Sequence, residues 1–227
     1  GSPFATNVEQ QAERGKIVVG YDGRLTSQEL VSALIQGLTH SGAEVINIGC
    51  GPTPMLYFAS YHLGATAAMM VTGSHNPPEY NGLKMVVGNK ALMAEEVKII
   101  GEMAQDHDFR TETGAHQEDL DLAHTYADTL LKDFKTYYPP TFQRIAWDAG
   151  NGATGRLIEE LVKRLPGEHI LLNTEIDGRF PNHHPDPTIE KNMRQLQDVV
   201  RANQCDYGIG FDGDGDRLGI VDDLGRM

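Results

Sequence analysis

The sequence of 227 residues contains only two cysteines, Cys50 and Cys205, and no long hydrophobic run. The two cysteines lie far apart and form no Cys-x-x-Cys or Cys/His cluster, so neither a disulfide framework nor a structural zinc site is predicted. Apolar runs such as 65–71 are far too short to span a bilayer. The opening Gly1-Ser2 lacks the basic segment of a signal peptide, and a cytoplasmic location is therefore expected.

Basic residues are also scarce, since 19 Lys and Arg stand against 32 Asp and Glu and give a formal net charge of −13 at pH 7. This charge argues against nucleic acid or an anionic membrane as the main partner. It does not argue against a small anionic substrate, because a local basic pocket can lie inside an acidic protein. The hydrophobic content of 40% and charged content of 22% are typical of globular proteins, and the length suffices for two ordinary domains.

What the sequence does contain is a regular alternation of predicted strands and helices. Strands are expected at 16–21, 43–48, 65–71, 83–87, 144–147, 170–173, 206–211 and 218–221. Helices are expected after a cap at Thr26 or Ser27, from Thr53, and at 94–105, 120–134, 154–164 and 189–203. A polar stretch between 106 and 119 is the candidate linker. The alternation predicts an α/β fold with two consecutive mixed or mostly parallel α/β/α sandwich domains of similar plan.

One loop between two predicted strands, residues 72–82, carries a chemically interesting serine and is called the serine loop. Gly73 leaves the backbone before Ser74 free to approach a ligand, and His75 and Lys84 can supply hydrogen-bond donors. In open α/β sheets, ligands bind beyond the carboxyl ends of the strands, which is where this loop is expected. A serine that only caps a turn is the alternative, and for a serine taken at random it is the commoner case.

The residues around Ser74 exclude several other kinds of site. A nucleophile elbow, G-x-S-x-G, requires glycine at the positions of Thr72 and Asn76. Neither a Walker loop nor a G-x-G-x-x-G motif surrounds Ser74. A serine that handles phosphate beside a metal therefore fits better than one that forms an acyl-enzyme.

A second loop, residues 212–217, is called the acidic loop because Asp212, Asp214 and Asp216 alternate in it with glycines. Ligands that are all oxygen favour a hard ion such as magnesium, manganese or calcium over zinc or copper. Three carboxylates leave room for a phosphate oxygen in an octahedral shell, which favours magnesium. Arg217 stands where an EF-hand requires glycine, so an EF-hand is excluded, and a solvated acidic turn is the remaining alternative.

Together the two loops resemble the signature loops of the α-D-phosphohexomutases, and more narrowly those of the phosphomannomutase/phosphoglucomutase branch. The segments that carry the resemblance are 72–84 and 210–217, with supporting matches at 20–24, 52–54, 148–152 and 180–187. The resemblance implies an isomerase, an intramolecular phosphotransferase acting on hexose phosphates of mannose or glucose. A phosphorylated serine would donate its phosphoryl group to the sugar, and a hexose 1,6-bisphosphate would be the intermediate and activator.

The resemblance also implies a role for each site residue. Ser74 would be the phosphoserine, and Asp212, Asp214 and Asp216 would hold one Mg²⁺ together with a phosphate oxygen on Ser74. His75 and Lys84 would act as acid/base and charge partners around the phosphoryl group, and Arg217 would help to bind it. Small-molecule hexose phosphates are thus the implied partners, and the oligomeric state is left open.

The family pattern also differs from this chain in extent. No counterpart of the family's first strand precedes Lys16, and the third and fourth family domains are not found. The chain is therefore expected to be a fragment, with domain 1 over residues 1–112 and domain 2 over 113–227. Little or no turnover is expected from it alone, which leaves a non-catalytic metal and phosphosugar-binding module as the alternative. A magnesium phosphohydrolase with an aspartyl nucleophile would leave the serine loop unexplained.

Overall fold

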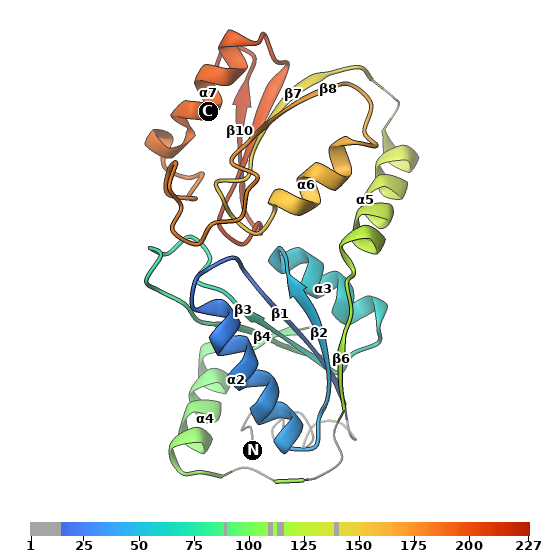
Figure 1. Cartoon of the computed structure of the whole chain (residues 1–227), viewed down its shortest axis with the longest axis vertical. Coiled ribbons are helices and arrows are strands. Elements are labelled where there is room, and N and C mark those ends of the chain that lie inside the picture. The colour runs from blue at the N-terminus through green and yellow to red at the C-terminus, as the bar shows by residue number, and fades with distance from the viewer. Residues whose placement is uncertain (1–14, 89, 109–110, 113–115, 139–140) are drawn as a thin grey trace.

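The computed structural model describes residues 15–88, 90–108, 111–112, 116–138 and 141–227, so the predicted linker lies partly outside the described residues. Two units follow each other along the chain, and each is built on one β-sheet (Figure 1). Helix α5 (Ala123–Tyr137) lies along the side where the chain passes from the first unit to the second (Figure 1).

The first unit has a six-stranded sheet in the order β5-β4-β3-β1-β2-β6. Its strands are β1 (Lys16–Tyr21), β2 (Glu44–Cys50), β3 (Ala67–Val71), β4 (Leu83–Val87), β5 (Lys90–Ala91) and β6 (Gln117–Asp119). Its helices are α2 (Ser27–His40), α3 (Thr53–His62) and α4 (Ala94–Gln105). Strands β3, β1, β2 and β6 pair in parallel, whereas β4 and β5 pair antiparallel with their neighbours.

Both faces of this sheet are covered by helices, as near-continuous apolar strands predict. All five residues of β3 are buried, and successive side chains point to opposite faces. Met69 packs with Val31 and Leu38 of α2, while Met70 packs with Leu56 of α3 on the other face. The central strands therefore form a rigid support for the loops at their ends.

The second unit has a four-stranded sheet in the order β10-β9-β7-β8. Its strands are β7 (Arg144–Asp148), β8 (Glu168–Leu172), β9 (Tyr207–Phe211) and β10 (Leu218–Asp222), and its helices besides α5 are α6 (Gly155–Val162) and α7 (Glu190–Ala202). Only β10 runs antiparallel to its neighbour, and α6 and α7 lie on opposite sides of the sheet (Figure 1). Met193, Leu196 and Val200 of α7 form the buried core with Ala146 of β7.

The two sheets share a plan, because β10-β9-β7-β8 repeats the order and directions of β4-β3-β1-β2. The predicted fold class, two α/β sandwich domains of similar plan, is thus confirmed. The serine loop joins β3 to β4, and the acidic loop joins β9 to β10. Both loops leave the carboxyl end of a parallel strand, and they meet where the two units face each other (Figure 1).

Several element bounds differ from the predicted ones. Helix α5 spans Ala123–Tyr137 instead of 120–134. The edge strands β5 and β6 were not predicted, and β6 joins the first sheet by pairing with β2. Residues of β6 are all exposed and polar, so no alternation of buried and exposed side chains marks them as a strand. The division at residue 112 stays a prediction.

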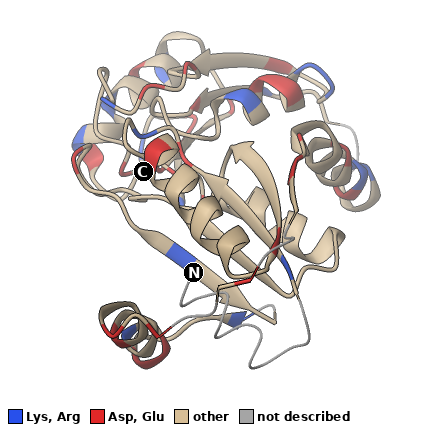
Figure 2. Cartoon of the chain, turned by 60° about the horizontal axis from the view of Figure 1, so that its bottom comes forward, with Lys and Arg blue, Asp and Glu red and all other residues tan. Residues whose placement is uncertain are grey.

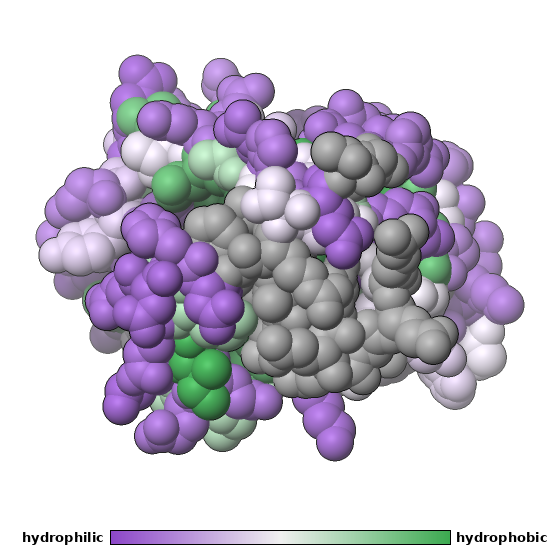
Figure 3. Space-filling view, turned by 90° about the horizontal axis from the view of Figure 1, so that it is seen from below, coloured by the Kyte–Doolittle hydropathy of each residue, from purple (hydrophilic) through white to green (hydrophobic). Residues whose placement is uncertain are grey.

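Charged residues and small apolar patches both occur on the described surface (Figure 2 and Figure 3). Acidic and basic residues are interspersed along the outer helices (Figure 2), and the first unit seen from below is mostly hydrophilic with small apolar patches (Figure 3). Cys50 is partly buried, Cys205 is buried, and both thiols are free. No helix among the described residues combines the length and apolarity needed to cross a membrane.

Candidate functional site

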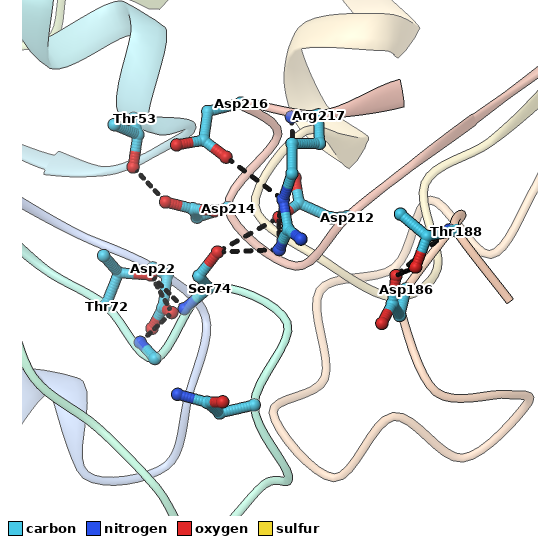
Figure 4. A network of polar contacts seen from close by, with 12 residues as sticks. Asp22, Thr53, Thr72, Ser74, Asp186, Thr188, Asp212, Asp214, Asp216 and Arg217 are labelled. Atoms are coloured by element: carbon cyan, nitrogen blue, oxygen red, sulfur yellow. Dashed lines mark hydrogen bonds and ion pairs between the residues drawn. The ribbon is translucent and has the colours of Figure 1, made fainter. Parts of the chain in front are cut away.

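Ser74 lies at the contact between the two units. Its hydroxyl donates to Asp212 Oδ2 at 3.2 Å and accepts a hydrogen bond from Arg217 Nη2 at 3.1 Å (Figure 4). Its backbone has a φ of 51°, in the left-handed region that non-glycine residues rarely adopt. The structure thus brings together three of the predicted site residues, one from the serine loop and two from the acidic loop.

The position of Ser74 is set by Asp22, a buried carboxylate that directly follows β1. Asp22 accepts hydrogen bonds from Thr72 Oγ1 at 2.8 Å and from the Gly73 N–H at 3.2 Å. Thr72 Oγ1 in turn accepts the Ser74 N–H at 2.8 Å. Because β1 and β3 are neighbours in the sheet, the end of one strand holds the loop that leaves the other.

The acidic loop is a tight turn closed by its own backbone. The Asp212 N–H donates to the Arg217 carbonyl at 3.1 Å, and the Gly215 N–H donates to the Asp212 carbonyl at 3.1 Å. Gly215 has a φ of +70°, and a Cβ there would lie 2.2 Å from Thr154 Cγ2, so only glycine fits. Arg217 also donates from Nε and Nη2 to Asp212 Oδ2, at 3.1 and 2.8 Å.

Asp214 is contacted by the first unit from two sides. The Thr53 hydroxyl, at the start of α3, donates to Asp214 Oδ2 in a short hydrogen bond, and the Thr53 N–H donates to the Asp214 carbonyl at 2.8 Å. Lys84 Nζ contacts Asp214 Oδ2 and Asp216 Oδ2, each at 2.6 Å. Lys84 is thus placed as a cation between two of the three predicted metal ligands.

Burial and these contacts shift the pKa values of the site in different directions. Burial, together with the nearby charge of Asp214, raises the pKa of Asp212 above its ordinary value. Burial also acts to raise the pKa of Asp214, but hydrogen bonds from Lys84 and Thr53 outweigh it and lower that pKa. Burial acts to lower the pKa of Lys84, and hydrogen bonds to Asp214 and Asp216 outweigh it, so the pKa is raised. Lys84 is therefore suited to act as a fixed positive charge rather than as a base.

The three aspartates of the acidic loop could hold a metal ion. One carboxylate oxygen from each of Asp212, Asp214 and Asp216 lies within 4.8 Å of the others. Asp214 Oδ1 is buried and has no hydrogen-bond partner among the described residues, so one ligand oxygen is available without breaking a contact. An all-oxygen donor set of this kind fits a hard divalent cation.

His75, the remaining predicted site residue, follows Ser74 in the loop. Its Nδ1 is buried and has no hydrogen-bond partner within the described part of the chain. Sequence reasoning did not select Thr53, Asp22 or Thr72 as site residues. Thr53 and Asp22 stand in the segments 52–54 and 20–24 that supported the family resemblance, and that position is the signal that could have found them.

Comparison with known families gives two adjacent matches. The model described as phosphoglucomutase/phosphomannomutase, alpha/beta/alpha domain I, matches residues 1–111, and the model of domain II matches residues 124–225. The chain belongs to the phosphoglucomutase/phosphomannomutase family. The resemblance inferred from the serine and acidic loops is thereby confirmed, because each loop lies inside one of the two matched domains.

Other proteins of the phosphoglucomutase/phosphomannomutase family are similar over nearly the whole chain. A phosphomannomutase/phosphoglucomutase of Pseudomonas aeruginosa is 40% identical over 211 residues, which is 93% of this chain and 45% of the relative. A phosphoglucomutase of Neisseria gonorrhoeae is 39% identical over 219 residues, covering 95% of this chain and 47% of the relative.

A solved structure of a phosphoglucomutase/phosphomannomutase family protein from Burkholderia thailandensis has the same fold. It superposes with a TM-score of 0.90 at 38% sequence identity, covering 99% of this chain and 50% of that one. The chain therefore spans about half the length of the relatives that it matches.

Proposed function

We propose that Ser74 is a phosphoryl carrier in a phosphohexomutase reaction. The reaction would interconvert the 1-phosphate and 6-phosphate of mannose, glucose or both, through a bisphosphorylated sugar. The observation that carries this proposal is the 3.2 Å contact between Ser74 Oγ and Asp212 Oδ2, two residues 138 positions apart in the sequence. A serine hydroxyl held against an acidic loop and hydrogen-bonded by an arginine has partners that phosphoryl transfer requires.

The acidic loop would serve as the metal site of this reaction. Asp212, Asp214 and Asp216 would each provide one oxygen to a Mg²⁺ ion, which would supply neutralisation of the negative charge on the phosphoryl group. Support comes from the spacing of the three carboxylates and from Asp214 Oδ1, which has no hydrogen-bond partner in the described part of the chain.

Side chains from both units would position the phosphoryl group and accept the proton of the sugar hydroxyl. In the forward step, the P–O bond to Ser74 Oγ breaks while a new P–O bond forms to a sugar hydroxyl, whose proton passes to a base. Ser74 Oγ leaves with a negative charge, which the hydrogen bond from Arg217 Nη2 would stabilise until a proton from solvent restores the hydroxyl. His75 is the candidate for that base, because it adjoins Ser74 and its Nδ1 is not engaged by a described residue. Arg217, which already donates to Ser74 Oγ, would hold a phosphoryl oxygen, and Lys84 would add positive charge beside the acidic loop.

Phosphorylation of the purified chain tests the proposal. Incubation with glucose 1,6-bisphosphate and magnesium chloride should add one phosphoryl group, which intact-mass spectrometry detects and peptide mapping should assign to Ser74. The Ser74→Ala variant should gain nothing. Ser32→Ala, which removes an exposed serine on α2, is the matched control and should be phosphorylated like the unmodified chain. Phosphate that never reaches Ser74, or that appears equally on Ser74→Ala, would contradict the proposal.

A second candidate is binding of the metal and a phosphosugar without turnover. The share of the relatives that this chain matches, about half, favours keeping it, since their remaining half has no counterpart among these 227 residues. Transfer of a phosphoryl group to Ser74 separates the two candidates, because binding alone would leave Ser74 unmodified. A coupled assay for conversion of hexose 1-phosphate to 6-phosphate then measures whether the complete reaction also occurs. We expect little or no conversion by this chain together with phosphorylation of Ser74, whereas conversion at the rate of a full-length relative would exclude the second candidate.

A further inference from the structure

Arg24, which follows β1 in the turn after Asp22, is buried with its side chain fully covered. A guanidinium has five N–H donors, and here all five have acceptors. Nε donates to Asp22 Oδ2 at 3.2 Å. Nη1 donates to the carbonyls of Pro77 and Tyr80 at 2.6 and 2.9 Å, and Nη2 donates to those of Ser74 and Asn76 at 2.8 and 2.7 Å. Four of the five hydrogen bonds therefore go to backbone carbonyls of the serine loop.

These bonds act on a loop whose backbone is unfavourable by itself. Ser74 has a left-handed φ of 51°, which persists only where the surroundings determine it. The guanidinium passes so close to the chain that a Cβ at Gly73 would lie 2.5 Å from Arg24 Cζ. Since one of the carbonyls that accept a hydrogen bond from Arg24 belongs to Ser74 itself, Arg24 helps to fix the direction in which the Ser74 side chain points.

The second unit covers this guanidinium with an aromatic ring. The Phe180 ring lies with its centroid 5.2 Å from Arg24 Cζ, within the range of a cation–π contact. Phe180 is itself buried and has a φ of 50°, a conformation that a bulky residue adopts only when its position is strongly specified. Gly178, two residues earlier, packs so tightly on the turn that a Cβ there would lie 2.6 Å from Arg24 Cα.

We propose that Arg24 is a positioning residue for Ser74. We further propose that Phe180 of the second unit keeps the Arg24 guanidinium in the orientation in which it donates to the serine loop. The second unit thus contributes to the site in two ways, with the acidic loop in contact with the Ser74 hydroxyl and Phe180 in contact with the Arg24 guanidinium. Packing of segment 176–180 against the turn that contains Arg24 would then determine the degree of order in the serine loop. This inference rests on the proposed function only in treating Ser74 as the reacting group.

Amide hydrogen exchange of the full chain, followed by mass spectrometry, tests whether the Arg24 hydrogen bonds order the serine loop. The Ser74, Asn76 and Tyr80 N–H groups are hydrogen-bonded within the serine loop and report on its order. Arg24→Lys, whose ammonium has only three donors on a flexible stem, should speed exchange in peptides covering 72–82 by about tenfold or more. Phe180→Leu keeps an apolar side chain but removes the ring face, and should speed exchange there by about 3- to 30-fold.

Rescue and control variants separate positioning from general packing. Phe180→Tyr restores the ring face and should return loop exchange to that of the unmodified chain. Phe58→Leu removes a partly buried ring that stacks on His62, away from Arg24, and should leave loop exchange unchanged. Peptides from α2 provide the internal reference for global unfolding in every variant.

Three results would overturn the inference. One is unchanged loop exchange in Arg24→Lys, and another is acceleration in α2 as large as in the loop, which would indicate only lost stability. The third is acceleration by Arg24→Lys alone, which would remove the role of Phe180. If Arg24→Lys does not fold, the Phe180→Leu and Phe180→Tyr pair carries the test. Exchange rates report on the order that Arg24 and Phe180 impose on the serine loop, and Ser74 phosphorylation reports on the reaction. The two proposals can therefore fail independently.

Discussion

Two buried aspartates, Asp22 and Asp148, occupy equivalent places in the two sheets and organise the loops around them. Asp22 follows β1 and gathers donors from the serine loop, whereas Asp148 ends β7 and accepts from the Gly150 N–H at 2.9 Å and from Asn173 Nδ2 at 2.9 Å. Asp148 also pairs with His183 Nε2 at 2.8 Å. A carboxylate at the end of a central strand can thus satisfy several loop donors at once, which fixes loops that carry no regular structure.

The Asp148–His183 pair makes stability depend on pH. Burial acts to lower the pKa of His183, but the hydrogen bond and charge of Asp148 outweigh it and raise the pKa above its ordinary value of 6.5. The folded chain then binds this proton more tightly than the unfolded chain. The pair therefore stabilises the fold fully below pH 6.5, and its contribution is lost as the pH rises through the folded-state pKa.

Urea unfolding at a series of pH values checks this expectation. The free energy of unfolding of the unmodified chain should include a component that falls as the pH rises through neutrality, with a slope of at most about 1.4 kcal/mol per pH unit for one proton. His183→Gln should lose that component, and His124→Gln, which removes an exposed histidine, should retain it. Identical pH profiles for the unmodified chain and His183→Gln would contradict the assignment.

Helix α7 is the element that supports the acidic loop from behind. Leu196 and Met193 on its buried face pack against the glycines of β9, where a Cβ at Gly208 would lie 2.9 Å from Leu196 Cδ1. Strand β9 leads directly into the acidic loop. The close approach of helix and strand therefore determines where that loop begins.

Truncation of the α7 core side chain should be costly. Leu196 is fully buried, and Leu196→Ala should lower the free energy of unfolding by about 2–5 kcal/mol, because the transfer free energy is lost and a cavity is left. Urea denaturation measures the change. Arg194→Ala, an exposed position on the same helix, is the matched control and should shift stability by less than about 0.5 kcal/mol. Equal losses for the two variants would show that α7 does not pack as described.

Elements with strong patterns could be predicted from the sequence, and elements held only by a neighbour could not. Strands β1 and β4 and helix α4 have the predicted bounds, because the two strands are short, mostly apolar runs and the apolar residues of α4 recur at helical spacing. Helix α5 begins three residues later than predicted, since the Leu120 N–H bonds to the Asn47 carbonyl of the first sheet. Strand β6 consists of exposed polar residues, and only the free edge of β2 gives it a partner.

The site as a whole is divided between the two units. Ser74, Lys84 and Thr53 come from the first, while the acidic loop and Phe180 come from the second. The sequence predicted which loops belong together, through the family resemblance. It could not predict the Thr53–Asp214 or Arg24–Phe180 contacts, because periodicity describes one element at a time and these contacts join elements more than 150 residues apart.

A site shared in this way should link metal binding to stability of the molecule. A ligand that binds only the folded chain stabilises it by about 2.7 kcal/mol at 100 times its Kd, so Tm should rise as magnesium chloride is added. Asp214→Asn should abolish most of this rise, because it removes a central carboxylate of the acidic loop. Asp223→Asn, at an exposed acidic position in the turn after β10, should respond to magnesium like the unmodified chain.

Differential scanning fluorimetry over a magnesium series, with sodium chloride keeping the ionic strength constant, measures this response. A rise in Tm of the same size in Asp214→Asn and in the unmodified chain would place metal binding somewhere other than the acidic loop.

Lys84 has a consequence that concerns how the two halves of the molecule depend on each other. Its ammonium contacts both Asp214 and Asp216, whereas Arg217 contacts Asp212 most closely. Two carboxylates of the second unit therefore find their nearest cation 130 and 132 positions earlier in the chain, in a different sheet. Separated from the first unit, the acidic loop would carry like charges that repel one another without that cation. Lys84 of the first unit is thus the counterion of two carboxylates in the second unit.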